Sequence, residues 1–235
     1  MPVALVTGAS RGLGLALARA LAERRWGLVI DAREPRALEA ARAKLAPLTR
    51  VHTVPGDVAD PRHRKELAAA VRSAGGLDLL VNNASVLGPS PQPALADHPL
   101  ADLERVYRVN VLAPLALTQL LLPQLRAGAG RTVVNVTSDA AVEPYAGWGG
   151  YGSAKAALNQ LSAILGAEQP ELRVYAFDPG DMRTRMHQDA FPGEDISDRP
   201  EPESVVLALL RLIDEGVPSG RYRASDLALA HEGRR

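Results

Sequence analysis

The segment Thr7-Gly8-Ala9-Ser10-Arg11-Gly12-Leu13-Gly14 decides the fold. It lies between an apolar run and an amphipathic stretch, so it is expected to turn a first β-strand into a first helix. Glycines allow a ligand to approach the backbone closely, and the free amides at the start of a helix attract phosphate. The turn therefore predicts a site for the pyrophosphate of a dinucleotide, formed by Gly8, Ser10, Arg11, Gly12, Leu13 and Gly14.

Short apolar runs alternate with amphipathic stretches along the rest of the chain. This pattern predicts buried parallel strands joined by helices that cover both faces of a sheet. The fold class is therefore α/β, a doubly wound parallel sheet of the Rossmann type, in a single domain over residues 1–235. The predicted strands are Val3–Thr7, Leu28–Ala32, Val51–Pro55, Leu77–Asn82, Arg131–Thr137 and Leu172–Asp178. A long loop within 182–202, ahead of a last helix at 202–215, is expected to form a substrate lid.

The composition argues against several classes of function. Lysine plus arginine and aspartate plus glutamate both total 27, and no basic patch is present, so the sequence predicts no nucleic-acid partner. The chain has no cysteine, which removes disulfides, thiolate nucleophiles and cysteine-bound metals, and we predict no metal site. No apolar run approaches bilayer length and no signal peptide is recognised, so we expect a cytoplasmic protein without a membrane partner.

Tyr151 and Lys155 are the first candidates for chemistry. Their spacing of four places both side chains on one face of a helix. A nearby cation favours the phenolate, so we expect Lys155 to lower the pKa of Tyr151 toward neutrality, where acid–base catalysis is efficient. The spacing alone is common, because an aromatic ring packed on an aliphatic stem produces it too.

Two further positions support a catalytic group. Ser138 follows a predicted strand and precedes the tyrosine by thirteen residues, where its hydroxyl can hold a substrate oxygen; Thr137 is the alternative hydroxyl. Asn110 lies inside a predicted helix at 100–126, four residues before Pro114. Because proline has no amide proton, the carbonyl of Asn110 is expected to be free.

Taken in order, these motifs resemble the short-chain dehydrogenase/reductase family over most of the chain. The resemblance implies NAD(P)-dependent oxidoreduction at a carbonyl or alcohol, with a catalytic group of Ser138, Tyr151, Lys155 and Asn110. It also implies that the main-chain carbonyl of the asparagine holds a water in a proton relay. The matching cofactor positions are Asp57, Val58, Asn83, Ala84, Tyr151, Lys155, Pro179, Gly180 and Thr184. The family usually continues Asn-Asn-Ala with glycine, whereas this chain has Ser85. Its Cβ is expected either to narrow the backbone conformations allowed to the loop or to crowd the cofactor ribose.

Cofactor choice depends on the end of the predicted strand Leu28–Ala32 and on Arg33. An acidic side chain there binds the ribose 2′-hydroxyl of NAD, whereas arginine accommodates the 2′-phosphate of NADP. Strand alternation turns Asp31 away from the face used by Ala32, and the resemblance matches Arg33 and Arg11 to the two basic positions of NADP-using members. We therefore favour NADP(H), contacted by Ala32 and Arg33. NAD(H) stays open, because a shift of one residue brings Asp31 to the ribose.

The substrate is expected to be a small carbonyl or alcohol compound in a mostly apolar pocket. The predicted substrate-binding residues are Val86, Tyr145, Trp148, Met182, Met186 and His187, with Leu87, Ala140, Val142 and Phe191 beside them. Two other functions stay open, an NAD-linked alcohol dehydrogenase and a nicotinamide-binding regulator without catalysis. The full catalytic group argues against the regulator, since cofactor binding alone does not need it. The resemblance further implies a homodimer or homotetramer, joined through helices at Leu112–Leu125 and Ala154–Leu165.

Overall fold

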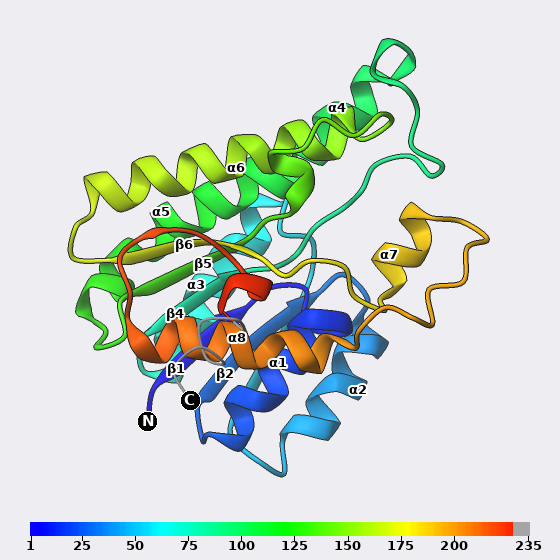
Figure 1. Ribbon diagram of the computed structural model, residues 1–235. Helices are drawn as coiled ribbons and strands as arrows, with labels where there is room; N and C mark the ends of the chain where they lie inside the picture. The colour runs from blue at the N-terminus through cyan, green and yellow to red at the C-terminus, as the bar shows by residue number, and fades with distance from the viewer. Residues whose placement is uncertain (228–235) are drawn as a thin grey trace, which may run out of the picture.

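The computed structural model describes residues 1–227, and seven parallel strands of that part form one sheet in the order β3-β2-β1-β4-β5-β6-β7 (Figure 1). The strands are β1 (Val3–Val6), β2 (Gly27–Ala32), β3 (Val51–Pro55), β4 (Leu79–Asn82), β5 (Thr132–Val136), β6 (Arg173–Asp178) and β7 (Gly220–Arg223). The strand order reverses between β1 and β4, as in a doubly wound sheet, so the predicted fold class is confirmed. The domain predicted over 1–235 includes residues 228–235, which lie outside the described residues.

β7 is a strand that the sequence does not predict. Its four residues, Gly-Arg-Tyr-Arg, are mostly polar and half-buried, as is typical of an edge strand. It pairs with β6 and brings Arg221 and Arg223 to the carboxyl end of the sheet. The six predicted strands correspond to β1 through β6, and each predicted end lies within two residues of the observed one.

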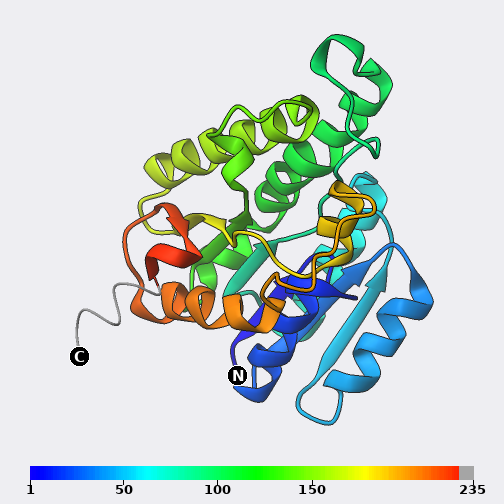
Figure 2. The ribbon, with the colours of Figure 1, turned by 45° about the vertical axis from the view of Figure 1, so that its right-hand side comes forward.

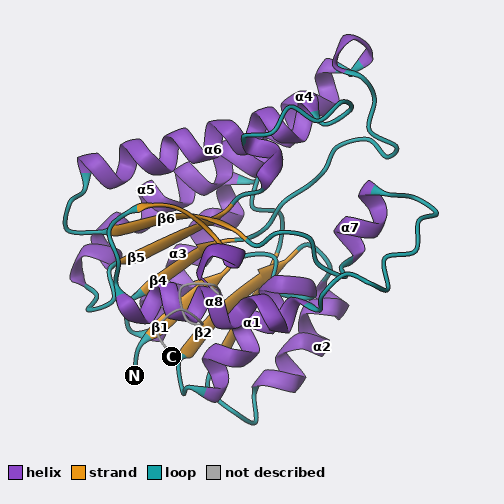
Figure 3. Ribbon diagram, viewed as in Figure 1, coloured by secondary structure: helices purple, strands orange, loops and turns teal. Residues whose placement is uncertain are grey.

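Helices cover both faces of the sheet (Figure 3). They are α1 (Gly12–Glu23), α2 (Pro35–Leu45), α3 (Pro61–Ala74), α4 (Leu100–Tyr107), α5 (Ala113–Ala127), α6 (Gly149–Glu168), α7 (Arg185–Ala190) and α8 (Pro202–Glu215). Because side chains alternate along a strand, Ala4 and Val6 of β1 pack with α1, α2 and α8. Val3 and Leu5 point to the opposite face and pack with α3 and α5. This two-sided core fixes the positions of the residues that follow each strand.

A π-helical turn, Arg108–Leu112, joins α4 to α5. Pro114 cannot donate a hydrogen bond to the carbonyl of Asn110. In this turn the amide of Ala113 donates a hydrogen bond to the carbonyl oxygen of Arg108, five residues earlier and not the four of an α-helix. The predicted long helix is thus present, and its π turn contains the residue for which we expected a free carbonyl.

The continuous helix Leu100–Ala127 is long and apolar enough to cross a membrane, so the expectation that no run reaches that length is wrong. Half of its most apolar window is buried inside the protein. Leu117, Leu121 and Leu125 belong to the core shared with the sheet. Since a core helix of a soluble domain meets the same length criterion, this helix gives no argument for a membrane-spanning segment.

Candidate active site

A cavity of about 1390 Å³ lies at the carboxyl ends of the strands, where ligands bind in open α/β sheets. Figures 1 and 2 both show α7 beside this edge of the sheet. The topology therefore brings motifs from distant parts of the sequence to one place. All the predicted cofactor residues line the cavity: Gly8, Ser10, Arg11, Gly12, Leu13, Gly14, Ala32, Arg33, Asp57, Val58, Asn83, Ala84, Tyr151, Lys155, Pro179, Gly180 and Thr184.

The glycine-rich turn after β1 is shaped for close approach of a ligand. Gly8 and Gly12 have φ angles of +66° and +54°, and a Cβ on Gly14 would lie 2.6 Å from the carbonyl oxygen of Gly8. The first turn of α1 has no acidic side chain, and the side chain of Arg11 at its N-cap makes no capping hydrogen bond. The first amides of α1 are therefore left for a ligand, and this arrangement fits a pyrophosphate.

Asn83 holds the turn after β4 against the glycine-rich turn. Its side-chain amide donates to the carbonyl oxygens of Thr7 at 2.8 Å and of Gly8 at 3.2 Å. The hydroxyl of Thr7 accepts from the backbone amides of Asn83 at 2.9 Å and of Ala84 at 3.0 Å. These bonds make the two turns one rigid wall of the cavity.

Asp31, at the end of β2, is only 1% exposed, and its carboxylate is engaged within the protein. Oδ1 accepts from the amide of Gly8 at 2.7 Å, and Oδ2 lies 2.9 Å from Nε2 of His63 on α3. Burial raises the pKa of Asp31, and these hydrogen bonds partly oppose the rise. Asp31 thus lines the cavity with its carboxylate bonded inside the protein, whereas the side chains of Arg11 and Arg33, which also line the cavity, are exposed.

Tyr151 and Lys155 are both buried in the first turns of α6. Nζ of Lys155 donates to the carbonyl oxygen of Val136 at 2.8 Å and lies 5.4 Å from the centre of the Tyr151 ring. Burial lowers the pKa of Lys155 to about 7. Burial also raises the pKa of Tyr151, which is the opposite of the shift toward neutrality that we expected from Lys155. The physical reason is that the same desolvation weakens the cation and penalises the phenolate.

Ser138, and not Thr137, is the strand-end hydroxyl that affects the pKa of Tyr151. Burial raises the pKa of Tyr151, and hydrogen bonds with Ser85 and Ser138 oppose that rise. Ser138 Oγ donates to Oδ1 of Asp139 at 2.9 Å. Thr137 Oγ1 is buried without a hydrogen-bond partner in the part of the chain that the structure describes. This arrangement favours Ser138 over Thr137 as the candidate catalytic hydroxyl.

The family model of short chain dehydrogenases matches residues 2–195. The chain belongs to the short-chain dehydrogenase family. It is 34% identical to sepiapterin reductase of Bos taurus over an alignment of 197 positions, which covers 78% of this chain and 74% of that protein. It is 29% identical to benzil reductase ((S)-benzoin forming) of Bacillus subtilis over an alignment of 240 positions including gaps, which covers 94% of this chain and 97% of that protein. A structure described as a short chain dehydrogenase from Shigella flexneri complexed with NADP has a TM-score of 0.85 at 26% identity, covering 95% of this chain and 97% of that chain.

These relatives are named reductases, and this short-chain dehydrogenase is accordingly an oxidoreductase that acts on carbonyl or alcohol groups. Its family binds nicotinamide cofactors, which agrees with the fit of the glycine-rich turn to a pyrophosphate.

Asn110 of this dehydrogenase lies behind the cavity wall, fully buried, and does not line the cavity. Its Oδ1 accepts from the amide of Val86 at 2.9 Å, and its Nδ2 donates to the carbonyl oxygen of Val86 at 2.8 Å. Ser85 Oγ donates to the same Oδ1 at 3.1 Å. Ser85 has no positive φ, so its side chain does not strain the loop as expected. It connects Asn110 to the cavity instead.

The substrate half of the cavity lies between Tyr151 and α7. Its walls include all six predicted substrate-binding residues, and these are Val86, Tyr145, Trp148, Met182, Met186 and His187. Leu87, Ala140 and Phe191 line it too, whereas Val142 does not and is 55% exposed. The prediction that Val142 lies in this lining is wrong, because the short helix η3 (Asp139–Ala141) ends before it and the side chain faces solvent. The Trp148 ring lies 5.8 Å from that of Tyr151 and 5.7 Å from that of Phe191, so the wall is aromatic.

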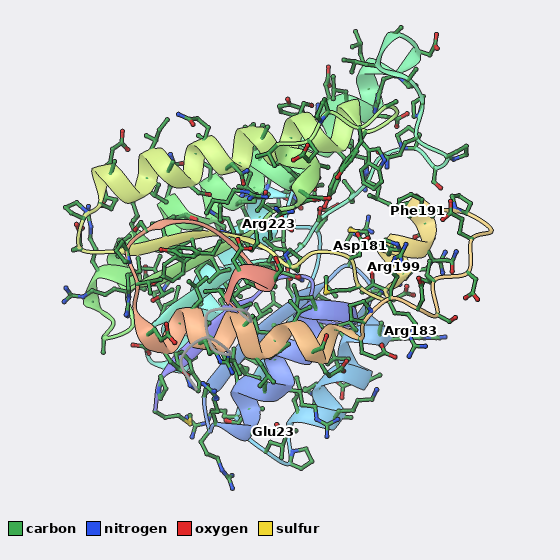
Figure 4. The ribbon with its side chains drawn as sticks, in the orientation of Figure 1. Glu23, Asp181, Arg183, Phe191, Arg199 and Arg223 are labelled. Atoms are coloured by element: carbon green, nitrogen blue, oxygen red, sulfur yellow. The ribbon has the colours of Figure 1, made fainter. Side chains whose placement is uncertain are left out.

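The predicted lid, 182–202, contains α7, and its arginines are paired with carboxylates. Arg183 pairs with Glu201, Arg185 lies 2.6 Å from Asp189, and Arg199 lies 2.7 Å from Asp198. Figure 4 shows Arg183, Arg199 and Phe191 around α7. These pairs neutralise much of the positive charge near the substrate half, while closing of the segment stays a prediction.

His63 and Asp139 are site residues that the sequence does not predict. His63 reaches Asp31 only because α3 packs against β2, and no local pattern announces that contact. Asp139 lines the cavity beside Ser138. A carboxylate directly after a candidate catalytic serine, at the end of a strand, was the signal that could have found it.

Proposed function

We propose that this dehydrogenase reduces aryl ketones or vicinal diketones with NADPH. The observation that carries the proposal is the position of Ser138 and Tyr151 beside an aromatic wall in the cavity that also contains the glycine-rich turn. The names of two relatives support a carbonyl next to an aromatic system, since benzil is a diaryl vicinal diketone. The apolar lining by Leu87, Trp148 and Phe191 suits such a ring.

The nicotinamide dinucleotide supplies the hydride when it is bound. In our proposal the hydroxyl of Ser138 turns from Asp139, to which it donates in the structure, to the carbonyl oxygen of the substrate. Tyr151 donates a proton to that oxygen as the carbon gains the hydride. Because burial raises the pKa of Tyr151, the phenol keeps its proton at neutral pH and is ready to act as an acid. Lys155 would hold the cofactor ribose, and the carbonyl of Asn110 would hold the water through which the proton is replaced.

NADPH is favoured over NADH because Arg33 and Arg11 line the cavity, while both carboxylate oxygens of Asp31 are already bonded to the amide of Gly8 and the ring of His63. Guanidinium groups bind phosphate with charge-assisted hydrogen bonds, and each such bond contributes about 1.5–3 kcal/mol. Arg33→Asp is therefore expected to lower kcat/KM with NADPH about 100-fold and to leave that with NADH unchanged or improved.

The measurement is a full kinetic comparison with both reduced cofactors at one fixed diketone concentration. Arg72→Ala is the matched control, because Arg72 lies in the last turn of α3 and does not line the cavity. An unchanged preference in Arg33→Asp would contradict the assignment. It would then favour the alternative of an NAD-linked alcohol dehydrogenase that uses Asp31, and absence of turnover with either cofactor would favour the regulator.

We also propose a homodimer or homotetramer joined through α5 and α6. Leu112, Leu120 and Ile164 are exposed large apolar side chains of the π turn, α5 and α6. Burial of such side chains in a partner would stabilise association. We expect sedimentation to give at least twice the monomer mass, and Leu120→Glu together with Ile164→Glu to give a monomer. A wild-type monomer at micromolar concentration would exclude this assembly.

A further inference from the structure

Asp139 places a carboxylate in the substrate half of the cavity, directly after Ser138. Its Oδ1 accepts from Ser138 Oγ at 2.9 Å and from the amide of Ala140 at 2.8 Å. Its Oδ2 accepts from the hydroxyl of Tyr145 at 3.0 Å. Three donors thus hold the carboxylate in place, one hydrogen bond away from the group that is proposed to bind the carbonyl oxygen.

The carboxylate of Asp139 is ionised at neutral pH. Burial raises the pKa of Asp139, but hydrogen bonds from Ser138, Tyr145 and Ala140 outweigh that effect and keep the pKa below its usual value. The charge of Arg223 contributes less, and Arg223 Nε lies 3.7 Å from the carboxylate of Asp178.

No cation cancels the charge of Asp139 at close range. Within residues 1–227, no lysine or arginine nitrogen forms an ion pair with it. Arg221 lies 2.7 Å from Asp178, and the arginines of the lid are paired with their own carboxylates. Figure 4 shows Arg223 apart from the arginines around α7. The carboxylate of Asp139 is therefore a negative charge in the cavity lining that has no ion-pair partner at contact distance, and Arg223 acts on it only from farther away.

The aromatic wall stands on the same side of the cavity as this charge. Tyr145, whose hydroxyl is bound to Asp139, has its ring centre 6.5 Å from that of Trp148 in an edge-to-face arrangement. Trp148 in turn contacts Phe191. Aromatic faces next to an anion favour positively charged groups and flat neutral rings, and they disfavour anions.

We propose that Asp139 sets the charge specificity of this dehydrogenase, admitting neutral and cationic aryl carbonyl compounds and rejecting those with a carboxylate or phosphate near the ring. The proposal rests on the proposed function, because it takes Ser138 as the partner of the carbonyl oxygen. An oxygen in hydrogen-bond contact with Ser138 Oγ lies within about 6 Å of Oδ1 of Asp139. Substituents close to that carbonyl therefore lie within the Debye length of about 8 Å at physiological ionic strength, where the charge of Asp139 is only partly screened.

A series of three 1-phenyl-1,2-propanediones tests the proposal, with trimethylammonium, tert-butyl or carboxylate at the para position. The tert-butyl group has the shape of trimethylammonium without its charge. In the wild type we expect kcat/KM with NADPH to be about tenfold higher for the ammonium compound than for the tert-butyl compound, and about tenfold lower for the carboxylate. In Asp139→Asn, which keeps the size of the side chain and one of its two accepting oxygens, both ratios should fall toward one.

Glu143→Gln is the matched control. Glu143 is an exposed carboxylate four residues further on, outside the cavity lining, so this variant loses the same charge without changing the site. Its two ratios should equal those of the wild type. Equal turnover of all three compounds by the wild type, or unchanged ratios in Asp139→Asn, would overturn the proposal.

Equilibrium binding of the same three compounds separates this proposal from the proposed function. Titration calorimetry in the presence of NADP should give dissociation constants with the same order in the wild type and no order in Asp139→Asn. If no compound is turned over but the binding order depends on Asp139, the proposed reaction is wrong and the charge specificity stands. If turnover is normal and the order is absent, the reaction stands and the charge specificity is wrong.

Discussion

Tyr151→Phe is expected to lower kcat for carbonyl reduction by about 1000-fold, since a positioned general acid contributes about 10²–10⁴-fold to a rate. The substitution removes one oxygen from a buried ring whose neighbours Trp148 and Lys155 stay in place. The dissociation constant for NADPH should change less than threefold, because the phenol is only one of many predicted cofactor contacts in the cavity and the others stay in place. Steady-state kinetics with a diketone and fluorescence titration of NADPH measure the two quantities.

Tyr222→Phe provides the control for this loss. Tyr222 is a β7 residue whose hydroxyl donates to the carbonyl oxygen of Pro218 at 2.8 Å, and it does not line the cavity. Its variant should keep wild-type turnover. Retention of more than a tenth of the wild-type kcat by Tyr151→Phe would show that another group donates the proton, and Tyr151 would lose its assigned role.

The pH dependence follows from the burial of Tyr151. Since burial raises its pKa, the phenol remains protonated from acid pH into the alkaline range, and the proton needed for reduction is present throughout. Oxidation of an alcohol needs the phenolate, so that direction should gain rate as pH rises. The sequence alone predicts the opposite shift, a pKa of Tyr151 lowered toward neutrality. It shows that Lys155 is near the tyrosine but not that both groups are buried.

The fold was predictable from the sequence because the strands of a parallel sheet are continuous apolar runs. β2 and β4 are fully buried, and no polar residue interrupts the pattern except Asp31 and Asn82. β7 escaped prediction because an edge strand buries little and its alternation of arginine and tyrosine is typical of many loops. The missed strand matters for the site, because it brings Arg221 and Arg223 beside the carboxylate of Asp178.

The predicted site residues are brought together because they follow strands that end at one edge. The sequence does not reveal the hydrogen bonds between side chains at that edge, such as Asp31 with His63 or Ser85 with Asn110. These contacts depend on the distance between a loop and a helix packed on it, which local pattern does not determine. The same limit applies to charge, because Asp139 is one carboxylate among many until its position beside Ser138 is known.

Lys155→Met is expected to remove turnover while making the cofactor-free protein more stable. Lys155 is 2% exposed, and no carboxylate among residues 1–227 forms an ion pair with it. Its folded-state pKa is about 7, against 10.5 for the ordinary side chain. Between these two pH values the unfolded chain binds a proton that the folded protein lacks, so the contribution of Lys155 to stability rises with pH across that window.

Methionine has a similar length and carries no charge, so it removes this cost and loses only the hydrogen bond to Val136. We expect the free energy of unfolding at pH 7 to increase by about 2–4 kcal/mol, and the increase to shrink below about 1 kcal/mol as pH approaches 10.5. Urea unfolding of cofactor-free protein at pH 7, 8.5 and 10 gives the comparison. Lys44→Met, at an exposed position in the last turn of α2, should show no such gain. If Lys155→Met is less stable than the wild type at every pH, interactions within the folded protein compensate the desolvation of the amine, and the prediction is wrong. Higher stability combined with lost turnover would instead identify Lys155 as a residue kept for its chemistry, at a cost to the stability of the fold.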